Sequence, residues 1–139
     1  MKRRSDWQFR LAEHHRQTFN RSFEWGEFDC AMAVCDAVKA MTGEDPAPGY
    51  RGTYHSLAAA LKICGGDLGN FAGGIAKAHG FREVPPAFGR RGDVVLVDNG
   101  EPSHALGIVD LSGRFALCAC EKGTVRLPMT RWLRAWQVG

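Results

Sequence analysis

The sequence has no apolar run long enough to cross a membrane, which takes about 20 residues. It also lacks a signal peptide, because the basic residues of "MKRR" lead into the polar stretch "SDWQFRLAEHH" and not into an apolar segment. We therefore expect synthesis in the cytoplasm and no membrane insertion. The basic run itself is typical of a solvated tail.

The five cysteines do not form a recognisable disulfide or zinc pattern. Their number is odd and their positions are scattered, which favours reduced thiols. Cys118 and Cys120 are one residue apart, unlike the CxxC spacing of zinc and redox sites. On a strand, both sulfur atoms would point to one face. We expect packing cysteines, no metal and no cofactor.

Features of nucleic-acid and nucleotide binding are missing as well. The formal net charge is only +3, and no stripe of aromatic and basic residues accompanies it. The glycine-rich stretch "GGIAKAHG" lacks the spacing of a phosphate-binding loop. We therefore expect no nucleic-acid partner.

The 139 residues predict one domain, 1–139, with a helical extension over 1–22. Apolar spacing and capping residues predict helices at 4–19, 30–41, 53–64 and 69–79. Short apolar runs then predict strands at 93–98, 104–111, 115–120, 124–129 and 132–138. This order indicates an α+β fold, with N-terminal helices packed on a C-terminal antiparallel β-sheet.

Cys30 opens the second predicted helix, directly after its capping residue Asp29. A helix N-terminus lowers the pKa of a thiol, and its free N–H groups can hold an oxyanion. Cys30 is thus a candidate nucleophile, although a buried packing thiol fits the same pattern. The carboxylate of Asp29 opposes thiolate formation unless it is engaged in capping, so the site needs a histidine.

His104 is the histidine best placed to serve Cys30. It opens a predicted strand far along the chain, which is the separation that a thiol hydrolase needs. The other four histidines are expected at surface or capping positions, with one of the first two inward and one exposed: His14, His15, His55 and His79.

The stretches "WGEFDCA", "RRGDVVLVD" and "HALGIVDL" occur in an order that resembles the NlpC/P60-like branch of papain-like cysteine peptidases. The chain also resembles a small phage and prophage family of unknown function placed beside NlpC/P60. The resemblance implies a papain-like fold without metal, which cleaves peptide bonds in peptidoglycan. It carries the nucleophile position to Cys30, the preceding acid to Asp29, and the strand that enters the core to Gly92–Val95.

The histidine of this family is followed by one apolar residue and then glycine, whereas two residues separate His104 from Gly107 here. On a regular strand the offset turns His104 to the wrong face, and a β-bulge would restore it. The third catalytic position also departs from the pattern, because the strand "RFALCAC" holds no polar partner and Glu121 lies just past it.

Two functions remain open. The first is a phage tail-associated cysteine peptidase or amidase acting on peptidoglycan peptides, with Cys30 and His104 as its catalytic pair. The second is an inactive structural or assembly protein of a phage tail tip, with other tail proteins as partners. Either would be virion-associated. Trp25, Arg51 and Tyr54 are candidates to line the cleft, although core packing, a turn and a helix cap explain them too.

Overall fold

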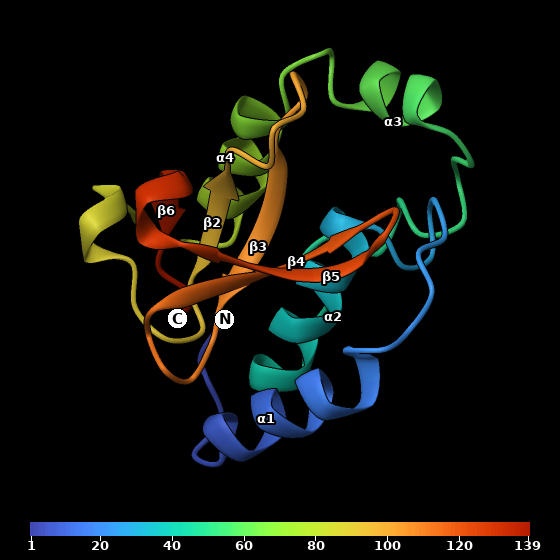
Figure 1. Ribbon diagram of the computed structural model, residues 1–139. Coiled ribbons are helices and arrows are strands. Elements are labelled where there is room, and N and C mark those ends of the chain that lie inside the picture. Colours follow the sequence, from blue (N-terminus) through green and yellow to red (C-terminus); the bar gives the residue numbers. More distant parts are fainter.

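The computed structural model describes residues 1–139 and has the α+β architecture that the sequence predicts. Four helices come first: α1 (Trp7–Thr18), α2 (Cys30–Thr42), α3 (Leu57–Ile63) and α4 (Leu68–Ala78). The antiparallel sheet has the strand order β1-β6-β2-β3-β4-β5 (Figure 1). Its strands are β1 (Glu83–Val84), β2 (Val94–Val97), β3 (Ala105–Val109), β4 (Phe115–Cys120), β5 (Gly123–Pro128) and β6 (Trp132–Trp136). No helix is both long and apolar enough to span a membrane.

The helices α1, α3 and α4 begin at residues other than those expected, and capping side chains fix the starts of α3 and α4. The hydroxyl of Ser56 accepts a hydrogen bond from the backbone N–H of Ala59 at 3.1 Å and starts α3 at Leu57. Thr53, the expected cap, donates instead to the carbonyl of Tyr50. The side chain of Asp67 likewise accepts from the N–H of Asn70 and starts α4 one residue early.

The core lies on both faces of the sheet. On one face, the apolar stripe of α2 packs against β3, with Leu11 of α1 in the same cluster. A second cluster of buried residues, which includes Val97 of β2 and Cys118 of β4, lies on the other face. Figure 1 shows α2 between α1 and the sheet. The N-terminus of α2 is therefore held against the sheet, where its first residue can meet the loop before β3.

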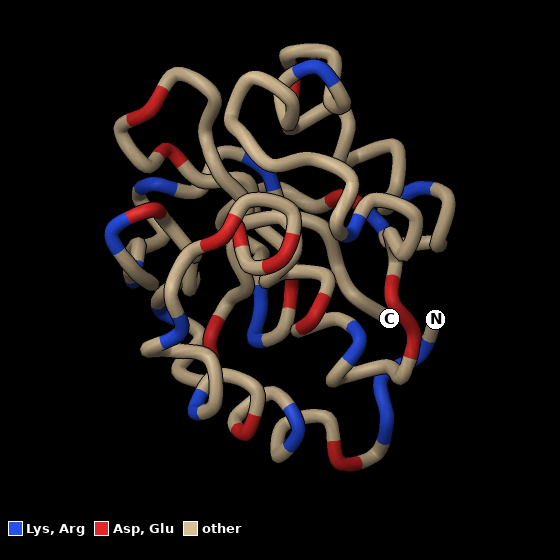
Figure 2. Tube along the Cα trace, turned by 90° about the vertical axis from the view of Figure 1, so that its right-hand side faces the viewer, with Lys and Arg blue, Asp and Glu red and all other residues tan.

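The N-terminal basic run is not a solvated tail, so that prediction is wrong. The guanidinium of Arg3 donates to the carboxylate of Asp93 and to the carbonyls of Arg91 and Val138, each at 2.7 Å. Asp93 is buried and also accepts from the backbone N–H of Val138 at 3.2 Å. We call this set the terminal clamp. It holds the two ends of the chain side by side (Figures 1 and 2).

Residues of both charge signs are distributed along the chain. Figure 2 shows Lys and Arg interspersed with Asp and Glu along the chain. Most of the six salt bridges join side chains that are partly exposed. Exposed pairs contribute little to stability. The Arg3–Asp93 pair differs because the Asp93 side chain is only 2% exposed.

The terminal clamp predicts a clear effect of Arg3→Ala. Removal of the guanidinium leaves a buried carboxylate with only backbone partners, so we expect the free energy of unfolding to fall by about 2 kcal/mol. Arg16→Ala is the control, because Arg16 pairs with Glu13 on the surface of α1 with its side chain 68% exposed. That change should cost less than about 0.5 kcal/mol. Urea unfolding of both variants tests this, and equal effects would contradict it.

Candidate functional site

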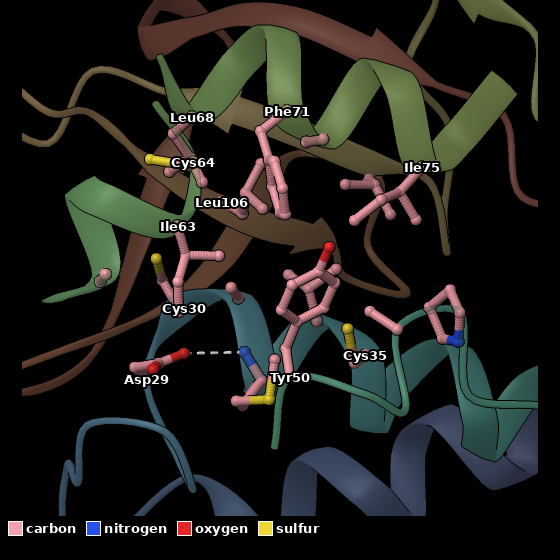
Figure 3. A pocket seen from close by; sticks show the side chains of 18 of the residues that line it. Asp29, Cys30, Cys35, Tyr50, Ile63, Cys64, Leu68, Phe71, Ile75 and Leu106 are labelled. Atoms are coloured by element: carbon pink, nitrogen blue, oxygen red, sulfur yellow. Dashed lines mark hydrogen bonds between the residues drawn. The ribbon is translucent and has the colours of Figure 1, made fainter. Parts of the chain in front are cut away.

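The buried carboxylate of Asp29 organises the start of α2. One oxygen accepts a hydrogen bond from the backbone N–H of Met32 at 2.8 Å (Figure 3). The other accepts from the N–H of Gly26 at 2.9 Å and from the hydroxyl of Tyr54 at 2.5 Å. Burial and this bond to Asp29 raise the pKa of Tyr54. The capping role expected for Asp29 is confirmed, and it fixes Cys30 as the first helical residue.

Gly26 is required at this site by its backbone. Its φ is +79°, and a Cβ atom there would lie 2.2 Å from the carbonyl oxygen of Tyr54. The carbonyl of Gly26 also accepts from the N–H of Gly52 at 2.8 Å. The segments that precede α2 and α3 are thus joined tightly, with Asp29 between them.

Cys30 lies at the mouth of a pocket and is partly buried. Burial is the main cause that raises its pKa to about 12, and the charge of Asp29 adds to the shift. Hydrogen bonds with backbone groups of Leu106 and Ala31 act in the opposite direction but do not outweigh burial. The lowered pKa expected at a helix N-terminus is therefore not found, and Cys30 is a neutral thiol in this structure.

His104 lines the same pocket mouth as Cys30. It precedes β3 and does not open it, because the strand begins at Ala105 and pairs with β2 without a bulge. With φ of +57°, His104 is the one residue other than glycine in the left-handed region. Its side chain is exposed and makes no hydrogen bond to Cys30. The β-bulge that would restore the register is therefore absent, and Ala105 takes the first position of the strand.

No polar side chain takes the third catalytic position. Glu121 is exposed in the turn after β4 and does not line the pocket. The sulfur atoms of Cys118 and Cys120 lie 3.6 Å apart, which confirms that they share one face. The hydrogen bond with Cys120 and burial raise the pKa of Cys118. The cysteines near Cys30 are packing residues of the sheet, and no cluster suited to a metal ion is present.

Three of the four candidate cleft residues line the pocket, namely Trp25, Asp29 and Tyr54. Arg51 does not, so its placement in the cleft is wrong. Its guanidinium donates to the carbonyl of Glu27 at 3.0 Å and to the carboxylate of Asp36. These bonds turn the side chain toward α2 and give it a structural role.

The pocket has a volume of about 150 Å³ and lies between α2, α3, α4 and the sheet. Of its 28 lining residues 24 are hydrophobic, a feature that sequence reasoning missed. Figure 3 shows Tyr50 between α2 and the residues Phe71 and Ile75 of α4. The apolar spacing of α3 and α4 was the available signal, but the same spacing fits residues of a filled core.

The remaining histidines lie away from Cys30. His14 and His15 are both partly buried and line a second, small crevice, so the expectation of one inward and one exposed ring is wrong. The Nε2 atom of His79 lies 2.8 Å from the carbonyl oxygen of Pro46, and His55 is exposed. Only His104 can serve Cys30.

Comparison with known families places the chain in one of them. A family described as a domain of unknown function (DUF6950) matches residues 2–138, and the chain belongs to this family. No curated protein sequence matches the chain. The description of the family states no activity, so the function has to be argued from the pocket and its residues.

The bonds of Asp29 predict a graded loss of stability. Asp29→Ala removes the helix cap and leaves the hydroxyl of Tyr54 buried without its partner, which should cost about 3 kcal/mol. Tyr54→Phe removes one hydroxyl and keeps the cap, and should cost about 1 kcal/mol. Thermal and urea unfolding of the two variants check the order. A larger effect of Tyr54→Phe would contradict the central role of Asp29.

The two histidines of the small crevice predict a dependence of stability on pH. Burial lowers the pKa of His15 to about 4 and also lowers that of His14, although Asp110 and Asp36 oppose the shifts. The unfolded chain therefore binds more protons between pH 4 and about 6.5, and stability falls as the pH is lowered through this window. We expect the loss from His15 to be at most about 3 kcal/mol.

His15→Gln should flatten this dependence, whereas His55→Gln, at an exposed position, should leave it unchanged. Urea unfolding at pH 7, 5.5 and 4.5 provides the measurement. If the His15→Gln variant loses as much stability on acidification as the parent protein, the crevice is not the cause.

Proposed function

We propose that the protein is a thiol hydrolase in which Cys30 attacks a carbonyl carbon and His104 takes up and returns the proton. One observation carries the proposal: the first residue of α2 and the residue before β3, far apart in sequence, both line one pocket. The left-handed backbone of His104 adds to it, because non-glycine residues in this conformation cluster at functional sites.

A base is necessary for this chemistry. With a pKa of about 12, only about one Cys30 thiol in 10⁵ is ionised at pH 7, so the thiol is not reactive by itself. His104 is exposed, and a rotation of its ring toward the pocket would bring a proton acceptor to the thiol. The transfer of the thiol proton from Cys30 to His104 then takes place when the substrate covers the opening of the pocket.

The start of α2 also offers donors for an oxyanion. Asp29 engages the N–H of Met32 with its side chain and that of Ala33 with its carbonyl. The N–H groups of Cys30 and Ala31 donate to no backbone carbonyl. They lie beside the sulfur atom at the positive end of the helix dipole, where a developing negative charge is stabilised.

The resemblance to NlpC/P60 peptidases supplies the substrate class to test first. It implies an amide bond in a peptidoglycan stem peptide, cleaved without a metal, in a protein of a phage tail. The structure offers Trp25 and Tyr54 as walls of the mouth next to Cys30. We therefore propose a cell-wall peptide as the first candidate substrate.

A specific observation favours a second function. Cys30 has no hydrogen bond to an imidazole, and burial keeps its thiol neutral. A structural or assembly protein of a phage tail tip would keep the fold of a hydrolase, and it would need neither a thiolate nor a catalytic base. The two proposals differ in what His104 does to the reactivity of Cys30.

Alkylation of Cys30 at different pH values separates the two functions. In a hydrolase the rate should show a step well below pH 12, because His104 takes up the thiol proton. His104→Ala should remove the step and leave only a rise toward pH 12, whereas His55→Ala, at an exposed site, should keep it. Peptide mass spectrometry with iodoacetamide measures the rate at each cysteine.

Release of peptides from purified peptidoglycan is the activity measurement. Cys30→Ala should abolish it and His104→Ala should reduce it at least about 100-fold. Alkylation of Cys30 that is the same in the parent protein and His104→Ala would refute the hydrolase and leave the structural function.

A further inference from the structure

We propose that the pocket behind Cys30 binds a straight aliphatic acyl chain of about six carbons, with the carbonyl carbon at the sulfur atom of Cys30. This inference deepens the proposed function, on which the position of the carbonyl rests. It replaces the cell-wall peptide, as the preferred substrate of the same site, by an acyl compound with an apolar tail. A cell-wall peptide then becomes a competing outcome of the test.

The polarity of the pocket is divided between its two ends. Its only polar or charged lining residues are Asp29, Ser103 and His104. Asp29 directly precedes Cys30 in the chain, and Ser103 and His104 line the pocket together with Cys30. The rest of the lining is mostly apolar and comes from α2, α3, α4, from the strands β2, β3 and β6, and from loops that include Tyr50 and Tyr54. A ligand that fits this division has a polar, reactive end at Cys30 and an apolar remainder.

The interior gives a polar substrate few groups to bind, and the hydroxyl of Tyr50 is the one phenolic group there without a hydrogen bond within the chain. The carboxylate of Asp29 already accepts three hydrogen bonds, from Met32, Gly26 and Tyr54. The Tyr54 hydroxyl is occupied by the same carboxylate. Burial of a charged or amide side chain deeper in the pocket would cost free energy without a compensating hydrogen bond. An aliphatic chain carries no such cost.

The volume sets the length of the chain. The pocket holds about 150 Å³, and a protein cavity of about this size binds benzene, which has six carbons. Tyr50 and Phe71 pack edge to face in the lining, with ring centroids 5.3 Å apart (Figure 3). Both rings present apolar surface against which an aliphatic chain can pack.

An ester such as 4-nitrophenyl hexanoate would transfer its acyl group to Cys30 in two steps. The sulfur atom of Cys30 forms a bond to the carbonyl carbon as the bond from that carbon to the phenolic oxygen breaks. The thiol proton passes through His104 to the leaving phenolate, and 4-nitrophenol departs. Water later cleaves the thioester, which returns the thiol and releases hexanoic acid.

Binding of neutral 1-alkanols from butanol to decanol tests the pocket without chemistry. Intrinsic tryptophan fluorescence reports it, because Trp25 and Trp136 line the pocket. Affinity should rise about fourfold with each added methylene up to about six carbons and then level off. An affinity that does not change with chain length would overturn the proposal.

Two matched pairs of variants locate the binding site. Ala72→Phe on α4 and Ala60→Phe on α3 fill the pocket, and each should weaken hexanol binding at least tenfold. Ala78→Phe and Ala58→Phe make the same change at exposed positions of the same helices and should bind like the parent protein. If one filling variant does not fold, the other decides. Equal binding by filling and control variants would overturn the proposal.

Acylation separates this inference from the proposed function. Mass spectrometry of the protein with 4-nitrophenyl acetate and hexanoate should show faster acylation of Cys30 by the hexanoate, and Ala72→Phe should remove the preference. Equal rates would overturn the acyl pocket and leave the hydrolase. Alkanol binding without any acylation of Cys30 would overturn the carbonyl position and the hydrolase together.

Discussion

The arrangement of the candidate site depends on one buried carboxylate. Asp29 accepts from the N–H of Met32, the N–H of Gly26 and the hydroxyl of Tyr54. Through these bonds it starts α2, tightens the turn before it and holds the segment that leads to α3. Cys30 follows it in the chain, so the same carboxylate determines where the sulfur atom lies. The hydrogen bonds that satisfy Asp29 also allow its charge to be buried beside a thiol.

Burial and reactivity oppose each other at this site. The packing of α2 against the sheet holds Cys30 in place but also raises its pKa to about 12. A nucleophile in such a position depends on a partner that enters from outside the core. His104 stands in a loop before β3, where no strand pairing limits the rotation of its ring. Rigid support for the sulfur and freedom for the base are thus divided between two elements.

Much of the fold could be predicted from local patterns. Asp29 before an apolar stripe predicted α2, and five apolar runs predicted β2 to β6. The start of α3 could not be predicted because Thr53 and Ser56 are equally good caps in sequence, and tertiary contacts decide between them. The two-residue β1 carries too little pattern to be recognised.

The site was predictable only in part, for physical reasons. Chain order and residue type singled out Cys30 and His104, and both line the same pocket. The pKa of Cys30 depends on burial by residues distant in sequence, and the ion pair of Arg51 with Asp36 depends on the path of the loop before α3. The apolar pocket depends on the spacing between helices, which no periodicity encodes.

The terminal clamp has a consequence for the synthesis of the chain on the ribosome. Arg3 is made first, yet its partners Asp93 and Val138 are made much later. Contacts between such distant residues form late in folding, because a long loop has to close before they contribute. The clamp is therefore completed only after Val138 has left the ribosome. Its closure then marks the point at which every strand of the sheet is available to pair.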